Sequence, residues 1–188
     1  MRWKVWVTIL FLAINIGMAV SQPPAQPPAQ SQPQSQPTGS MDISHAKSSV
    51  PAGPLKITFA GKSAELTATT LAALPHTTLT VYNEHAKASQ TYSGVPLIDL
   101  LTRLGVPDKP HGKDFRLYLV AEGSDGYQVV YSVAEVAPDV HDGAVIVADA
   151  LDGKPIADDG PLKLVAAGEK RPARWVRNLV AIRVQTAE

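Results

Sequence analysis

The sequence predicts an α+β domain, mainly β, with mixed sheets and short inserted helices. Apolar residues alternate with polar ones at Leu55, Ile57 and Phe59, and again at Leu79 and Val81, which is the period of a half-buried strand. Glycine and proline separate many short segments of this kind. The 188 residues, 45% of them hydrophobic, suffice for one core and leave no room for a second domain beside the tails.

Residues 1–21 predict a signal peptide. An apolar run from Val5 to Met18 follows Arg2 and Lys4, and small residues come next. The alternative is a membrane anchor, but the run is shorter than the roughly 20 residues that cross a bilayer. We therefore expect a cleaved signal, no stable membrane insertion afterwards, and a periplasmic or secreted protein of a bacterium. Cleavage would leave 15 basic and 17 acidic residues, a formal charge of −2.

Residues 22–54 predict a disordered linker. The stretch is rich in Gln and Pro, with a doubled QPPA unit, and lacks the large apolar side chains that would offset the entropy cost of ordering. Its prolines also allow a second interpretation, a ligand for a groove that binds polyproline. The folded domain is expected at residues 55–188.

Cysteine is absent from the chain, which excludes disulfides, thiolate metal ligands and a lipoprotein anchor. The net charge of zero gives no reason to expect nucleic acid as a partner. The five histidines lack the spacing of a metal site, so no metal ligands are predicted.

In the first half of the domain, Thr70 is expected to cap a short helix through Leu74. Gly94 is expected at a turn, followed by a helix over Leu97–Leu104 that ends at Gly105.

In the second half, the pattern predicts a hairpin from Phe115–Glu122 and Tyr127–Ser132 around Gly123–Gly126. Ser132 is expected to cap a brief helix containing Val133 and Val136. Three more strands are expected over Gly143–Leu151, from Leu162 and from Leu179.

Several short motifs occur in a characteristic order: Tyr92–Leu97, Asp125–Tyr127, Asp152–Ile156, Gly160–Val165, and Arg174–Val176 before Ile182–Val184. In order and spacing, from about residue 66 to residue 184, they resemble the oxidoreductase molybdopterin-binding domain of sulfite oxidase-like proteins. The resemblance implies the sulfite oxidase-type fold, with molybdopterin as the candidate cofactor. It also implies that two dithiolene sulfurs and one Cys thiolate hold the metal, and this chain lacks that thiolate.

The resemblance further implies that Asp158, Lys163 and Arg174 occupy the positions that contact the pterin and its phosphate. Asp158 replaces an Asn with an anion, and Lys163 replaces an Arg and loses its bidentate geometry. The resemblance also implies that relatives which carry the cofactor are exported folded by the twin-arginine route, whereas this signal has no arginine pair. These departures argue against a bound cofactor.

Charge is segregated along the sequence, with an acidic stretch over 122–159 and a basic one over 163–183. Arg171, Arg174 and Arg177 could converge on a phosphate or carboxylate, or could instead pair with the acidic stretch. Trp175 and Tyr127 could stack against a flat ring, or could serve only in packing.

The function expected from these observations is an exported binding module of this fold for a small anionic or pterin-like ligand. The alternative is a periplasmic molybdopterin-dependent oxidoreductase that works with a redox partner, so enzymatic activity stays open. A third interpretation is a structural domain that binds an envelope protein.

Overall fold

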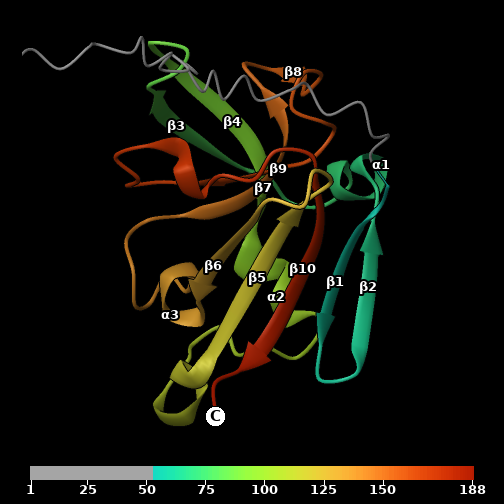
Figure 1. The fold of residues 1–188 in the computed structure, drawn as a ribbon, viewed down its shortest axis with the longest axis vertical. Coiled ribbons are helices and arrows are strands. Elements are labelled where there is room, and N and C mark those ends of the chain that lie inside the picture. Colours follow the sequence, from blue (N-terminus) through green and yellow to red (C-terminus); the bar gives the residue numbers. More distant parts are fainter. Residues whose placement is uncertain (1–52) are drawn as a thin grey trace, which may run out of the picture. The chain divides into compact units, whose positions relative to one another are not determined.

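Two five-stranded sheets form the framework of residues 53–188, which are the residues that the computed structural model describes (Figure 1). The predicted signal peptide and all but the last two residues of the predicted linker lie outside the described residues. The mainly β, mixed-sheet prediction is confirmed.

The first sheet has the strand order β2-β1-β10-β5-β6. Its strands are β1 (Leu55–Phe59), β2 (Lys62–Leu66), β5 (Leu117–Gly123), β6 (Gln128–Ser132) and β10 (Leu179–Thr186). β1 and β10 run parallel and the other neighbours antiparallel. Alternate residues of β5 and β6 are buried, for example Leu117, Leu119 and Ala121 in β5, so one face of the sheet covers the core.

The second sheet has the order β3-β4-β7-β8, with β9 also paired to β7. Its strands are β3 (Thr77–Asn83), β4 (Ala88–Pro96), β7 (Val145–Leu151), β8 (Lys154–Pro155) and β9 (Lys163–Ala166). β7 is the central strand, and its first four residues, Val145–Ala148, are all buried. Such a continuous apolar run is typical of a strand covered on both faces.

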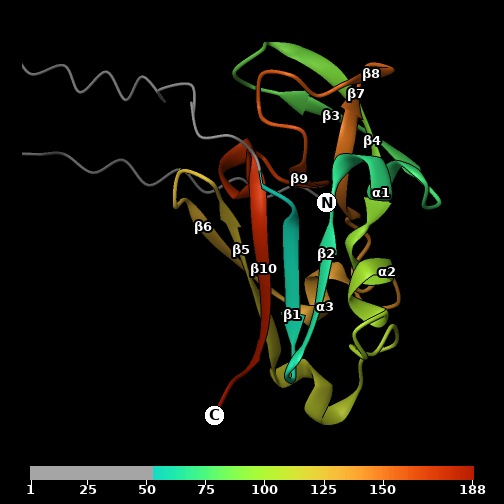
Figure 2. The same ribbon diagram turned by 90° about the vertical axis from the view of Figure 1, so that its right-hand side faces the viewer.

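The helices are short: α1 (Ala68–Ala72), α2 (Leu97–Thr102), α3 (Val133–Val136), and the 3₁₀ helices η1 (Gly112–Arg116) and η2 (Pro172–Arg174). Figure 2 shows α1 and α2 on the same side of the first sheet. A helix starting at Leu97 is confirmed, although it ends at Thr102 and not at Leu104, and the expected cap of α3 by Ser132 is confirmed. None of the helices in residues 53–188 is long and apolar enough to cross a membrane.

The predicted start of one helix and of one strand is wrong. The cap of α1 is Thr67, because its hydroxyl accepts from the Thr70 backbone N–H at 3.1 Å while the Thr70 hydroxyl accepts from the Thr67 N–H at 2.8 Å. Thr70 therefore sits inside the first turn. Phe115, expected in a strand, belongs to η1, and β5 begins at Leu117.

Gly94 lies inside β4 and not at a turn. A Cβ at this position would lie 2.2 Å from the backbone oxygen of Val147 in β7. The glycine thus allows two strands to approach closely at the irregularity in their pairing. β2 and most of β4 were not predicted as strands.

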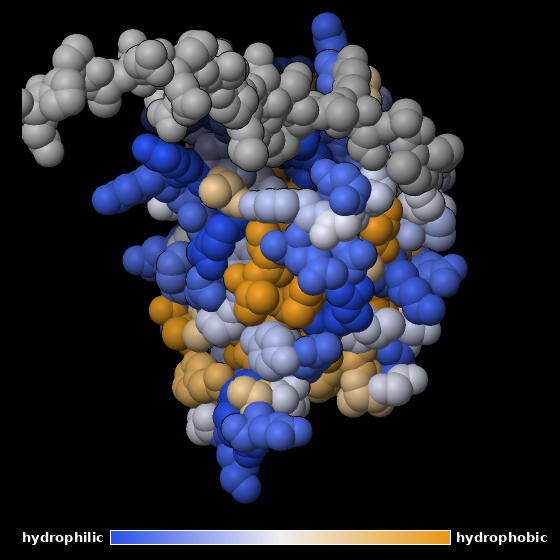
Figure 3. Space-filling view, in the orientation of Figure 1, coloured by the Kyte–Doolittle hydropathy of each residue, from blue (hydrophilic) through white to orange (hydrophobic). Residues whose placement is uncertain are grey.

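A small hydrophobic area lies over β5 and β6 on the face of the molecule shown in Figure 3, among hydrophilic surroundings. Val120 and Val130 are direct cross-strand partners there, and Val130 is 54% exposed. β6 is an edge strand, and the candidate site lies beside it.

Candidate functional site

The segment that joins β9 to β10, residues 167–178, is called the β9–β10 loop below. It leaves β9 and then folds back on it, because Leu164 and Val176 exchange both of their backbone hydrogen bonds, at 2.9 and 3.1 Å. The loop carries three of the predicted site residues, Arg171, Arg174 and Trp175.

Lys163 is a buried cation, only 4% exposed, at the start of β9. Its ammonium nitrogen lies 2.5 Å from a carboxylate oxygen of Asp159 and 3.2 Å from the hydroxyl of Tyr92. The same nitrogen lies 5.1 Å from the centre of the Tyr92 ring and 5.4 Å from that of Trp175, so two aromatic faces complete its surroundings. Lys163 was predicted to contact an external anion. Its positive charge is instead neutralised by Asp159 of the same chain.

Trp175 is buried at 5% exposure. Its indole N–H donates to the Ala166 carbonyl at 3.0 Å, and its ring meets Tyr92 edge to face with centroids 5.7 Å apart. These contacts support the packing interpretation and leave little of the ring exposed for stacking.

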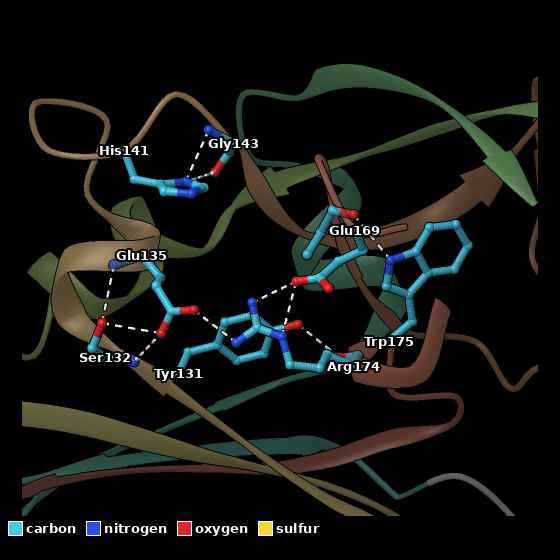
Figure 4. A network of polar contacts seen from close by, with 9 residues as sticks. Tyr131, Ser132, Glu135, His141, Gly143, Glu169, Arg174 and Trp175 are labelled. Carbon is cyan, nitrogen blue, oxygen red and sulfur yellow. Dashed lines mark hydrogen bonds and ion pairs between the residues drawn. The ribbon is translucent and has the colours of Figure 1, made fainter. Parts of the chain in front are cut away.

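Arg174 is bound by two carboxylates (Figure 4). Its Nε and one terminal nitrogen donate to the same oxygen of Glu169, at 2.9 and 2.5 Å, and its other terminal nitrogen donates to Glu135 at 2.7 Å. The guanidinium also lies 4.4 Å from the centre of the Tyr131 ring. The hydrogen bonds to Glu169 and Glu135 raise the pKa of Arg174 above its ordinary value.

Glu135 is held in place by the start of α3. One of its oxygens accepts from the backbone N–H and the hydroxyl of Ser132, at 2.8 and 3.0 Å, which leaves the other oxygen directed at Arg174. Burial raises the pKa of Glu135, but the bonds from Ser132 and Arg174 outweigh burial, and the pKa lies below its ordinary value.

Two tyrosines from the hairpin side fasten the β9–β10 loop through its backbone. The Tyr131 hydroxyl donates to the Arg174 carbonyl at 2.7 Å, and the half-exposed Tyr127 donates its hydroxyl hydrogen to the Ala173 carbonyl. Burial raises the pKa of Tyr131, so its phenol stays protonated and remains a donor.

The remaining predicted residues lie apart from this network. Arg171 is exposed, and no ion pair of its side chain is found within residues 53–188. Asp158 lines a shallow hollow of about 340 Å³ beside β7 and β8. Arg177, 40% exposed, lies 4.0 Å from Asp159, so the arginines of the loop do not converge on one point.

Glu135, Glu169, Tyr92 and Tyr131 were not predicted as site residues. The spacing of Ser132 and Glu135 is that of a capping box and could have drawn attention to Glu135. No sequence pattern indicates Glu169, because its contact with Arg174 lies within an irregular loop.

The molybdopterin site that the resemblance implies does not fit these side chains. The chain has no cysteine to supply the metal thiolate. Of the two cations assigned to the pterin and its phosphate, Lys163 is bound to Asp159, and Arg174 to Glu135 and Glu169. Within residues 53–188, no group of three or more His, Cys, Asp or Glu side chains is placed to hold a metal ion.

No curated protein matches the chain. The model of one family, described as the oxidoreductase molybdopterin binding domain, matches residues 55–188. This match covers most of the chain and agrees with the order of motifs and with the two-sheet fold. The chain therefore belongs to the oxidoreductase molybdopterin-binding domain family.

Proposed function

We propose that this protein is an exported, molybdenum-free member of its family that works as a binding module and not as a redox enzyme. The observation that carries the proposal is the state of Lys163, an ammonium enclosed by Tyr92, Trp175 and its own carboxylate partner Asp159. A buried ion pair of this kind is costly to open, because opening it leaves an unpaired charge in a poorly solvated place.

Two features of the sequence support the proposed absence of redox chemistry and the proposed periplasmic location. The chain has no thiolate for molybdenum. Its N-terminal segment has the pattern of a signal for export in the unfolded state, so the protein would reach the periplasm before any cofactor could be enclosed.

The proposed binding surface is the exposed rim of the β9–β10 loop. Lys170 and Arg171 are exposed there, and Arg177 is partly exposed. Cations at a solvent-exposed rim favour an anionic partner and speed its association. We propose a small anionic ligand or an acidic surface of an envelope protein as that partner.

The proposal is tested by molybdenum and pterin analysis of protein purified from the envelope of its native host. Metal and pterin well below one per chain are expected. Stoichiometric molybdenum together with redox turnover would refute the proposal.

The binding surface is tested with Arg171→Gln/Arg177→Gln. Material that co-purifies with the wild type should be lost from this variant, as seen by mass spectrometry of both small molecules and proteins. The matched control is Lys56→Gln/Lys113→Gln, which removes two exposed cations elsewhere and should retain the partner.

Family membership favours one second candidate, a periplasmic molybdopterin-dependent oxidoreductase with a redox partner. In that case the pterin sulfurs alone, or an oxygen ligand, would hold the metal. The same metal analysis separates the two functions.

A further inference from the structure

The ion cluster around Arg174 contains one cation and two anions, all on partly buried side chains. The exposed fraction of the side chain is 38% for Arg174, 33% for Glu135 and 20% for Glu169. All three nitrogens of the guanidinium donate to a carboxylate. The charge of the arginine is therefore neutralised, and three of its five N–H donors are used, by its own chain.

The two glutamates reach Arg174 from different parts of the fold. Glu169 belongs to the β9–β10 loop itself, whereas Glu135 belongs to α3, which follows β6. Figure 4 shows the guanidinium between the two carboxylates. The contact with Glu169 closes the loop on itself, and the contact with Glu135 ties the closed loop to α3.

The backbone of the loop is hydrogen-bonded to β6 and to Tyr127, the residue before it. The hydroxyls of Tyr127 and Tyr131 bind two successive carbonyls, those of Ala173 and Arg174. The position of Arg174 is thus fixed by its backbone, and the two carboxylates fix the direction of its side chain.

We propose that Glu135 and Glu169 form an internal ligand for Arg174, which takes the place of an external oxyanion and lets the β9–β10 loop close on β6 and α3 without a cofactor. The inference goes beyond the proposed function, because it concerns how the domain closes and would hold whatever partner binds at the rim. It also explains how the loop can be held closed with no anion bound: charge-assisted hydrogen bonds to the arginine are made within the chain.

The inference predicts a concealed oxyanion site. In Glu135→Gln/Glu169→Gln the shape of both side chains is kept and both negative charges are removed, so Arg174 becomes available. Inorganic phosphate is a suitable probe, because its oxygens can accept the same N–H donors. Phosphate binding is measured by calorimetric titration, with ionic strength held constant by sodium chloride.

The dissociation constant for phosphate is expected to be at least about tenfold lower in the double variant than in the wild type, whose arginine is occupied. The double variant should also melt at a lower temperature than the wild type in the absence of phosphate, and added phosphate should recover part of that loss. Adding Arg174→Gln to the double variant should abolish both effects, which would locate the site at Arg174.

The matched control is Glu65→Gln/Glu84→Gln, which removes two exposed carboxylates elsewhere and should behave as the wild type does. If the double variant is unfolded without an added anion, phosphate should restore its circular dichroism spectrum. The inference is overturned if the wild type binds phosphate as tightly as the double variant, or if phosphate neither binds the double variant nor refolds it. Both outcomes are measured in the Arg171→Gln/Arg177→Gln background, so that phosphate bound at the rim does not contribute. Neither outcome then depends on metal content or on the rim arginines, and this test can fail separately from the proposed function.

Discussion

Tyr131 contacts Arg174 twice: its hydroxyl donates to the Arg174 carbonyl at 2.7 Å, and its ring lies 4.4 Å beneath the Arg174 guanidinium. A single side chain of β6 thereby holds both the backbone and the head group of the residue at the centre of the β9–β10 loop. The orientation of the loop depends on this edge strand as well as on the ion pairs.

Tyr131→Phe tests the backbone contact alone. The ring and its contact with the guanidinium remain, while the partly buried carbonyl of Arg174 loses its donor. We expect a loss of about 1–2 kcal/mol in the free energy of unfolding, measured by urea denaturation. Tyr82→Phe is the control, since Tyr82 is 53% exposed and should change little. Equal stability of Tyr131→Phe and the wild type would mean that the hydrogen bond contributes nothing.

Lys163→Met removes the cation that Asp159 binds and keeps an unbranched apolar side chain against Tyr92 and Trp175. Because the Asp159 side chain is 28% exposed, solvent relieves part of the penalty. We expect a loss of about 1–3 kcal/mol, below that of a fully buried broken pair. Lys163→Met/Asp159→Asn should regain most of it.

Lys154→Met serves as the control for this series, because Lys154 is exposed. A double variant that is no more stable than Lys163→Met would show that the two side chains are not energetically coupled.

The His76–Asp149 contact predicts a pH dependence of stability. Both ring nitrogens of His76 face oxygen, with the Leu74 carbonyl at 2.7 Å and the Asp149 carboxylate at 3.0 Å. Burial opposes protonation, but these two bonds outweigh it and raise the pKa of His76 above its ordinary value of 6.5. The contribution should therefore be complete below pH 6.5 and disappear as the pH rises through the higher pKa of the folded state.

The pH prediction is checked by comparing the wild type with His76→Gln in urea denaturation from about pH 5 to pH 8. The stability advantage of the wild type should shrink as the pH rises. His85→Gln, at an exposed histidine, controls for general effects of pH. An advantage that stays constant or grows over this range would contradict the prediction.

The sequence predicted those parts of the fold whose signals are local. Alternation at Leu79 and Val81 gave β3, leucine spacing gave α2, and Ser132 gave the start of α3. The candidate site depends on contacts between distant segments. Arg174 was predicted either to bind an anion or to pair with the acidic stretch over 122–159, and the structure shows a pair with Glu135 of that stretch. Local pattern could not single out Glu135, because it is 39 residues away in sequence.

Glycine at position 94 shows the same limit in the fold. A glycine before Val-Pro is a reasonable turn signal, since Gly and Pro often interrupt elements. Its actual role is to let β4 approach β7, and only the pairing of the two strands reveals this. Local pattern could not distinguish the two roles.

Gly94→Ala should be strongly destabilising for this reason. The added Cβ would lie 2.2 Å from the Val147 oxygen and 2.5 Å from the Ala148 Cα, and both are backbone atoms. β7 cannot move away easily, because Val147 is also paired with Leu164 of β9 on its other side. We expect a loss of about 2–4 kcal/mol in the free energy of unfolding, measured by urea denaturation. Gly53→Ala, where an added Cβ would meet nothing within 4 Å, should leave the denaturation midpoint unchanged. Matching midpoints for the two variants would show that β4 and β7 can separate at low cost, and that the close approach does not fix their pairing.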